Sequence, residues 1–449
     1  SEAQYTTTAG LAAAAALFCF TTARSNQGKK RFFLDNIPTF LLAWISFSMR
    51  QNIFYLCLPM AGMLWLSKWI LSRRNRHEDT AFKLLGFVLI LGVGMGILWG
   101  INAAAYASPE WSDFRKINHY RERVGDFYSW PEYEECKDDL AALGIDEETY
   151  YYRRNGAPCI GYEMSVSDWE QMHRIAKKCY LARTDWRERL KNIVVGLINT
   201  FFYEDGMQPA NLLAGLLLFF TLGSILFQRN GQALFVYLMY LFGRTVSWCY
   251  VLYEGRFPKR IVQPLITVDY MILFAILLAF NLLQLDRARK FVVLLCIVLP
   301  LSVLSFSITR TNVRENYYVH QKNWEGLKDY CFSHPDNFYI WTYASGTLEH
   351  FCETPFAADQ DVYQNFIYTN WGVMCNPNTQ KKLSDQGIGN FGRDLVNSDH
   401  VYFILQDAPF NQEHPVLMYF RLTYHAKMQV ADTFTAGDTT YCVYQFHPL

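Results

Sequence analysis

The sequence predicts an α-helical polytopic membrane protein with about eight transmembrane helices, a mostly helical outer loop domain and a small α/β C-terminal outer domain. Of the 449 residues, 51% are hydrophobic and 18% are charged, whereas soluble domains carry about 25% charged residues. Charge is nearly absent from several stretches of about 20 residues and dense between them, which is typical of repeated membrane crossings. Aromatic residues make up 17% of the chain, and many Trp and Tyr lie near the ends of the apolar stretches, where a headgroup layer favours them.

Each apolar stretch is expected to cross the bilayer, because about 20 residues at 1.5 Å per residue span roughly 30 Å of hydrocarbon. The predicted crossings are Thr6–Ala23, Ile37–Ser48, Asn52–Leu71, Phe82–Tyr106, Pro209–Gln228, Gln232–Tyr253, Pro264–Leu285 and Phe291–Thr309. Ile37–Ser48 is short, so it is either a broken or re-entrant helix or it continues past Arg50. Asn192–Phe202 is also short and is interpreted as a helix lying in the interface before the fifth crossing.

The orientation follows from Lys and Arg in the short loops, since cytoplasmic loops carry an excess of these residues. Eight crossings place four basic clusters on the same side, which is therefore cytoplasmic: Arg24 with Lys29–Arg31, Arg73–Arg76 with Lys83, Arg229, and Arg287–Lys290. The long segment Ala107–Lys191 and the tail Arg310–Leu449 are then both extracytoplasmic. The chain is expected to divide into crossings 1–4 (residues 1–106), an outer helical domain (107–191), the interfacial helix with crossings 5–8 (192–309) and an outer α/β domain (310–449).

The outer loop domain reads as helical. Asp146, Glu147 and Glu148 mark a helix start, because acidic residues complement the positive end of the helix dipole. Ser165–Arg189 has the pattern of an amphipathic helix, with Ser167 as its predicted N-cap.

The tail alternates helical and strand patterns, which favours a small α/β domain. Trp324–Phe332 is predicted to be a helix. The predicted strands are Phe338–Tyr343, Val401–Leu405, Lys427–Phe434 and Thr440–Phe446, the last two joined by a hairpin turn at Thr435–Asp438.

Motifs for nucleotide, metal and acyl-transfer chemistry are missing from the sequence: it contains no Walker A loop, no GxGxxG after a strand, no HExxH and no GxSxG. Gly92, Gly94 and Gly96 lie within one crossing and are interpreted as close helix packing. The eleven cysteines include no CxxC, so disulfides or free thiols are favoured over a metal site, and no cofactor is identified. A net charge of zero indicates no nucleic-acid partner.

The candidate site residues lie at the outer ends of the crossings. The basic candidates for a lipid phosphate are Arg50, Arg256, Lys259 and Arg260, and the acidic candidates are Glu204, Asp205 and Asp269. The basic loop is interpreted either as interfacial snorkelling or as an anion site, because Arg binds phosphate in a bidentate manner. Asp269 is expected either to pair with Arg244 or to orient a lipid headgroup. Glu204 and Asp205 are interpreted either as acidic residues at an ordinary helix start or as metal ligands or acid–base groups. Together these residues are expected to face one outer-leaflet cavity suited to a lipid-linked phosphosugar.

A family resemblance adds to this reading. The segments Tyr5–Ala9, Met49–Asn52 with Leu58–Pro59, Tyr106–Trp111 and Tyr253–Arg260 resemble multi-pass membrane proteins of clostridial-type Gram-positive bacteria. The layout is similar to that of the GT-C class of membrane glycosyltransferases, which implies a polyprenyl-phosphate sugar donor and an acidic catalytic residue in the first outer loop. That loop is expected to lie upstream of Ser1, so the resemblance transfers no catalytic residue to this sequence.

Two functions remain open on the sequence. The first is a GT-C-like membrane glycosyltransferase that uses a lipid-linked phosphosugar donor in cell-envelope glycan assembly. The alternative is a non-enzymatic envelope membrane protein, active in transport, scaffolding or sensing, with glycan-binding outer domains. In both cases the expected location is the cell membrane, and the expected partners are membrane lipid and, for the first, a polyprenyl-phosphate sugar.

Overall fold

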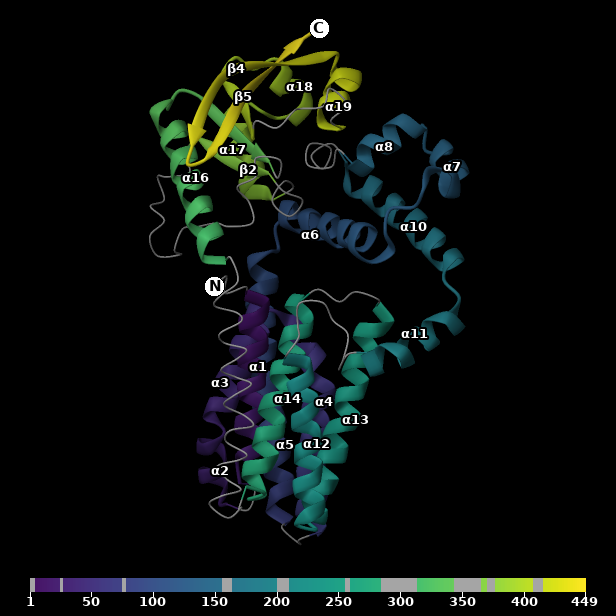
Figure 1. The fold of residues 1–449 in the computed structure, drawn as a ribbon, viewed down its shortest axis with the longest axis vertical. Helices are drawn as coiled ribbons and strands as arrows, with labels where there is room; N and C mark the ends of the chain where they lie inside the picture. The colour runs from purple at the N-terminus through teal and green to yellow at the C-terminus, as the bar shows by residue number, and fades with distance from the viewer. Residues whose placement is uncertain are drawn as a thin grey trace. The chain divides into compact units, whose positions relative to one another are not determined.

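The computed structural model describes residues 5–24, 27–74, 78–155, 164–199, 210–254, 259–283, 313–342, 365–369, 376–406 and 415–449, most of them helical. The chain forms two compact units (Figure 1). The first, here called the helical unit, comprises Ser1–Ala105 and Thr184–Arg310. The second, the sheet unit, comprises Tyr106–Arg183 and Thr311–Leu449. Most of the two segments that the sequence predicts to be extracytoplasmic therefore belongs to one unit.

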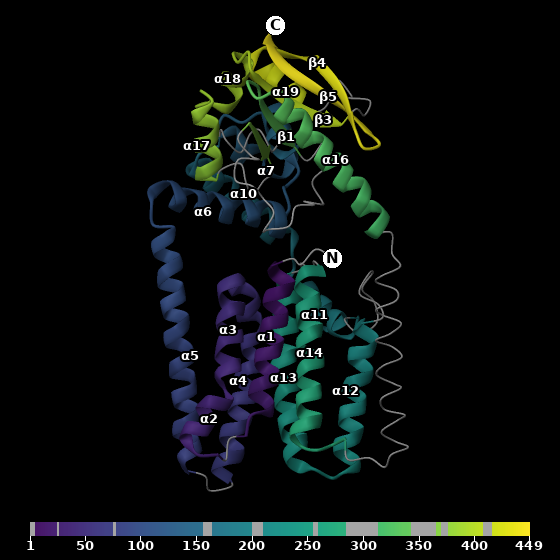
Figure 2. The same cartoon turned by 90° about the vertical axis from the view of Figure 1, so that its left-hand side faces the viewer.

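The helices of the helical unit follow the predicted apolar segments. They are α1 (Tyr5–Thr22), α2 (Lys29–Asp35), α3 (Ile37–Met49), α4 (Gln51–Arg74), α5 (Glu78–Ala105), α11 (Trp186–Asn199), α12 (Ala210–Phe227), α13 (Gly231–Glu254) and α14 (Lys259–Ala279). Most of them run side by side as a bundle (Figure 2). The predicted interfacial segment Asn192–Phe202 overlaps α11, while the predicted crossing Phe291–Thr309 lies outside the described residues.

Four of these helices are long and apolar enough to cross a membrane: Gln51–Arg74, Asp79–Ala105, Gly231–Glu254 and Arg260–Ala279. The pair α2 and α3, bent by 42° at its break, adds a fifth candidate if it acts as one span. The apolar part of α12, Leu213–Phe227, is shorter. The described residues thus contain four or five candidate spans, which supports a membrane protein.

The chain breaks at Arg50, as one reading of the short segment predicted. Arg50 is extended (φ −156°, ψ 94°), its N–H donates to Ser46 O at 3.0 Å, and its carbonyl accepts from the N–H groups of Ile53 and Phe54 at 3.2 Å. The carbonyl of Arg50 therefore starts α4, while its N–H closes α3. The alternative, that the Ile37–Ser48 helix continues past Arg50, is wrong.

Close helix packing depends on particular glycines. A Cβ at Gly243 of α13 would lie 2.6 Å from the carbonyl oxygen of Pro59 and 2.8 Å from Cα of Met60, both in α4. On α5, Gly94 faces the indole of Trp44, but a Cβ at Gly92 or Gly96 would meet nothing within 4 Å. The close-packing prediction therefore holds for Gly94 and is wrong for the other two within the described residues, because their face of α5 has no neighbouring helix there.

The sheet unit contains a five-stranded sheet with the order β2-β1-β3-β5-β4. Strands β1 (Phe338–Thr342), β2 (Phe366–Thr369) and β3 (Val401–Gln406) are parallel, and β4 (Ala426–Ala436) and β5 (Thr439–Pro448) form the predicted antiparallel hairpin. The helices are α6 (Pro109–Glu122), η1 (Arg123–Tyr128), α7 (Tyr133–Ala141), α8 (Glu147–Asn155), α10 (Val166–Arg183), α16 (Val313–Ser333), α17 (Pro377–Asp385), α18 (Phe391–Val396) and α19 (Pro415–Tyr424). The small C-terminal sheet is thus confirmed, with β2 as a strand that the sequence did not predict.

Alternating side chains give the sheet two apolar faces. Tyr339 and Trp341 of β1 pack with Trp324 of α16 on one face. Phe338 and Ile340 point the other way, into a core shared with α18, α19 and the segment that holds α7, α8 and α10. Strand alternation places successive residues on opposite faces, so each face needs its own cover. The 106–183 segment provides part of that cover.

Helix starts in the sheet unit follow the acidic and serine signals, with one correction. The N–H of Thr149 donates to Asp146 Oδ1 at 2.8 Å, which confirms the start of α8. The cap of α10 is Ser165, not Ser167: Ser165 N–H donates to Asp168 Oδ2 at 2.8 Å, and Asp168 N–H donates to Ser165 Oγ at 3.2 Å. This reciprocal pair satisfies two backbone donors, which Ser167, already inside the helix, cannot do. The predicted helix Ser165–Arg189 is also divided, since α10 ends at Arg183 and α11 begins at Trp186.

In the sheet unit, Cys136, Cys179 and Cys331 are buried free thiols, and Cys442 is also buried. Burial raises the pKa of the Cys136 thiol to about 11, so this thiol is protonated at neutral pH. Cys159, Cys352 and Cys375 lie outside the described residues.

Candidate functional site

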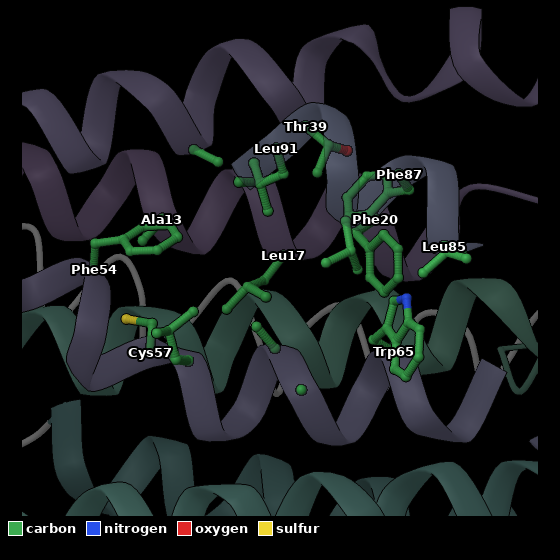
Figure 3. Close-up of a pocket in the computed structure, with 16 residues that line it drawn as sticks. Ala13, Leu17, Phe20, Thr39, Phe54, Cys57, Trp65, Leu85, Phe87 and Leu91 are labelled. Carbon is green, nitrogen blue, oxygen red and sulfur yellow. The ribbon is translucent and has the colours of Figure 1, made fainter. Parts of the chain in front are cut away.

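An apolar cavity of about 390 Å³ lies inside the helical unit, between α1, α3, α4 and α5 (Figure 3). Its lining includes small residues from three helices, namely Ala13, Ala16, Ala43, Ala61 and Gly62. Where neighbouring helices present Ala and Gly toward one another, their side chains leave space that larger residues would fill. The small residues on these facing helices therefore create the cavity.

Aromatic rings lie at the two ends of this cavity. In Figure 3 the rings of Phe20, Phe87 and Trp65 gather at one end, and Phe54 lies with Cys57 at the other. Phe20 and Phe87 are in direct contact, with ring centroids 4.9 Å apart. The result is an elongated space along α4, and the eleven residue steps from Phe54 to Trp65 correspond to about 16 Å of helix.

Two polar groups of the lining form hydrogen bonds within the helical unit. Trp65 Nε1 donates to the carbonyl of Leu84 at 3.2 Å, and Thr39 Oγ1 donates to Asn36 Oδ1 at 3.5 Å. Among the residues that the structure describes, no charged side chain lines the cavity. An occupant therefore finds dispersion contacts and almost no hydrogen-bonding groups, which suits a hydrocarbon chain.

Arg50 is located one helical turn from the Phe54 end of the cavity, as the hydrogen bond from Phe54 N–H to Arg50 O shows. Its guanidinium lies over the ring of Tyr5, 5.4 Å from the centroid, and Nη1 donates to the Tyr5 hydroxyl at 3.2 Å. Within the described residues no carboxylate pairs with it. Arg50 is half-buried, so its remaining N–H donors are available to an anion beside the apolar space.

Asp269 occupies a different place. Its carboxylate is fully buried in the bundle, where Oδ1 accepts from the Tyr240 hydroxyl at 2.6 Å and Oδ2 accepts from Arg244 Nε at 2.9 Å. The guanidinium of Arg244 also lies over Trp248, 5.5 Å from its ring centroid. The pairing expectation is thus confirmed. Because both carboxylate oxygens are engaged, the structure gives no support to headgroup orientation by Asp269.

The structure describes only part of the remaining predicted site residues. Glu204, Asp205 and Arg256 lie outside the described residues. Lys259 is the first residue of α14, and Arg260, the next, is exposed. Arg260 is nine residues from Asp269, or about 14 Å along the helix, so these two charges lie at different depths.

Sequence reasoning missed the lining of the cavity. The residues that form it are common in membrane helices. The sequence of one apolar segment does not indicate how closely the neighbouring helices pack against it. The signal that was present is the repeated Ala of α1 together with Ala43, Ala61 and Gly62. No group of three His, Cys, Asp or Glu side chains in the described ranges is placed to hold a metal ion.

Comparison with known proteins adds nothing to this geometry, since no protein family, curated protein or solved structure matches the chain.

Proposed function

We propose that this chain is a GT-C-like membrane glycosyltransferase that takes a lipid-linked phosphosugar as its donor. The observation that carries the proposal is the apolar cavity that begins one turn from Arg50. A polyprenyl chain fits the apolar space, and its phosphate then lies within reach of a guanidinium at the end of α3. The catalytic group is expected elsewhere, because the described lining of the cavity contains no charged side chain.

The proposal includes the full topology of eight crossings. The four basic loop clusters then face the cytoplasm, and residues 107–191 and 310–449 lie outside. Arg50, at the turn between α3 and α4, is then on the outer side, where an envelope glycan is assembled. Protease treatment of intact cells tests this layout: cleavage of the final hundred residues is expected, and cleavage of the Arg73–Arg76 loop with the tail spared contradicts it.

Binding of the lipid is tested with two variants of the full chain in nanodiscs. Gly62→Leu fills the cavity, since a Cβ at Gly62 meets nothing within 4 Å, and it is expected to weaken binding of both polyprenyl phosphate and neutral polyprenol. Arg50→Gln is expected to weaken only the phosphate, by about 10- to 100-fold, because hydrogen bonds to charged groups contribute about 1.5–3 kcal/mol. Native mass spectrometry measures both affinities.

Matched controls carry the same substitutions at other places in the helical unit. Gly96→Leu places a leucine on α5 away from the cavity, and Arg74→Gln removes an exposed guanidinium at the opposite end of α4. Equal affinities for the Gly62 and Gly96 variants would show that the lipid chain binds elsewhere. A separate double substitution, Arg256→Ala with Arg260→Ala, tests the basic loop in the same assay.

Transfer is measured with radiolabelled polyprenyl-phosphate sugar and cell-envelope acceptor. The proposal predicts label in the acceptor and loss of that label in the Arg50 and Gly62 variants. Binding without transfer would instead support the non-enzymatic envelope protein.

A further inference from the structure

A second cleft, of about 430 Å³, lies in the sheet unit where the starts of α7 and α8 meet. Its lining combines aromatic rings with charged groups: Glu132, Tyr133, Glu147, Glu148, Tyr150, Tyr151, Tyr152 and Arg154. All of these residues lie in one stretch of chain that the proposed lipid site does not use. A ligand of this cleft therefore does not depend on the proposed lipid site.

Two of the tyrosines form a fixed base for the cleft. Tyr150 is buried, and its hydroxyl donates to the carbonyl of Pro131 at 2.7 Å. Tyr152 is also buried, and its hydroxyl donates to Glu148 Oε1 at 3.4 Å. These rings are held by the core of the unit, so the base of the cleft exists before any ligand binds.

Two other tyrosines expose ring surface at the cleft. Tyr151 is 51% exposed, and its ring meets that of Tyr152 edge-on, with centroids 5.5 Å apart and planes at 83°. Tyr133 is half-buried and lies 6.1 Å from the ring of Tyr150. The faces of aromatic rings carry a partial negative charge, which attracts C–H groups with partial positive charge. Pyranose rings present such C–H groups on one face.

A rigid ion pair provides hydrogen-bonding groups beside the rings. Arg154 Nη1 and Nη2 donate to the two carboxylate oxygens of Glu132, each at 2.9 Å. The Glu132 side chain is 70% exposed, and the N–H of Glu132 donates to Glu135 Oε2 at 2.8 Å at the start of α7. Carboxylate oxygens have further lone pairs, so each can accept additional hydrogen bonds from hydroxyl groups.

We propose that this cleft binds a saccharide. The cleft combines aromatic ring faces, which suit the C–H side of a pyranose, with carboxylates that can accept hydrogen bonds from its hydroxyls. Neither a purely apolar chain nor a nucleic acid matches that lining. The lining also holds three carboxylates against one guanidinium. A saccharide with free amino groups therefore binds more tightly than its N-acetylated counterpart, because each ammonium lies near an excess of negative charge.

Isothermal titration of the full chain in nanodiscs tests the site with two probes, a β-1,4-linked glucosamine tetrasaccharide and its fully N-acetylated form. We expect both to bind, the free amine at least about 5-fold more tightly. Tyr151→Ala is expected to weaken both by about 10-fold or more, and Tyr151→Phe, which keeps the ring face, is expected to retain binding. Glu147→Gln is expected to reduce the preference for the free amine.

Two controls match these variants within the sheet unit. Phe332→Ala removes an exposed ring, 41% accessible, that lies outside the cleft. Glu110→Gln removes a first-turn carboxylate from α6, as Glu147→Gln does from α8, so both change the helix dipole contribution equally. No binding of either probe, or equal effects of Tyr151→Ala and Phe332→Ala, overturns the proposal. Competition by tetramethylammonium as strong as by the tetrasaccharide also overturns it, since the cleft would then be a small-cation cage.

Discussion

Lys68 of α4 donates from Nζ to the carbonyl of Ala23 at 2.7 Å, so a lysine of one helix closes the C-terminal end of another, α1. The same ammonium donates to the carbonyl of Phe20, which lines the apolar cavity. Carbonyls at a helix C-terminus lack intrahelical partners and carry the negative end of the helix dipole. The contact therefore holds α1 and α4 together at the end opposite Arg50.

We predict that Lys68→Met lowers the free energy of unfolding by about 1–3 kcal/mol. The carbonyls of Phe20 and Ala23 would lose the hydrogen-bond donor that half-buried Lys68 provides. Thermal unfolding in detergent micelles measures the change. Lys30→Met, which removes an exposed lysine of α2, is the control and should leave the melting temperature nearly unchanged. Equal shifts for the two variants would contradict the role of Lys68.

Removing one partner of the buried Arg244–Asp269 pair is expected to cost about 3–5 kcal/mol, since the remaining charge is left without compensation. Asp269→Leu and Arg244→Met should each destabilise the helical unit strongly. The double variant should be more stable than either single one, because no unpaired charge remains. Chemical denaturation of the four proteins gives the coupling free energy, and additive effects would show that the pair is not coupled.

Gly243→Ala is predicted to destabilise the α4–α13 contact by about 1–3 kcal/mol, because the new Cβ would overlap the backbone of Pro59 and Met60, which cannot rotate away. Gly223→Ala on α12 is the matched control, since a Cβ there meets nothing within 4 Å. Helix propensity favours alanine in both cases, so stabilisation of the Gly223 variant and destabilisation of the Gly243 variant are expected. The melting temperatures of the two variants and of the unchanged protein measure both effects.

Lys382 gives the sheet unit a pH dependence on the alkaline side. Burial lowers the pKa of Lys382 to about 8, while its Nζ donates to the carbonyl of Phe366 at 2.8 Å. The unfolded chain keeps this proton up to a pKa of about 10.4, so between pH 8 and that value it binds more protons than the folded chain. The Lys382 contribution to stability therefore rises with pH across this window. Lys382→Met should remove that rise, which melting temperatures of both proteins between pH 7 and 10 will measure.

The apolar segments predicted most helices of the bundle because length and hydropathy are local properties of the chain. The break at Arg50 was visible for the same reason, as a charged residue between two apolar runs. The partner of Asp269 was also foreseeable, since a buried carboxylate in a membrane helix requires a cation and Arg244 is the one placed mid-helix.

Other features depend on which helices and strands contact one another, and a local sequence pattern does not predict such contacts. The cavity arises from the fit of four helices, so its lining is indistinguishable from ordinary membrane residues in the sequence. Strand β2 has only four residues, Phe366–Thr369, and is a strand because β1 pairs with it. The cleft of the sheet unit was missed because its tyrosines read as part of a generally aromatic segment.

The sheet unit is assembled from two stretches of chain, Tyr106–Arg183 and Thr311–Leu449, that share one core. A ribosome makes the first stretch well before the second, and at roughly 5–20 residues per second the intervening chain takes about 6 to 25 seconds to synthesise. During that delay the early stretch has Trp169, Met172 and other core side chains without the sheet that covers them. Its final fold must await the end of translation, so premature termination anywhere in the last strands would leave both stretches as substrates for quality-control proteases.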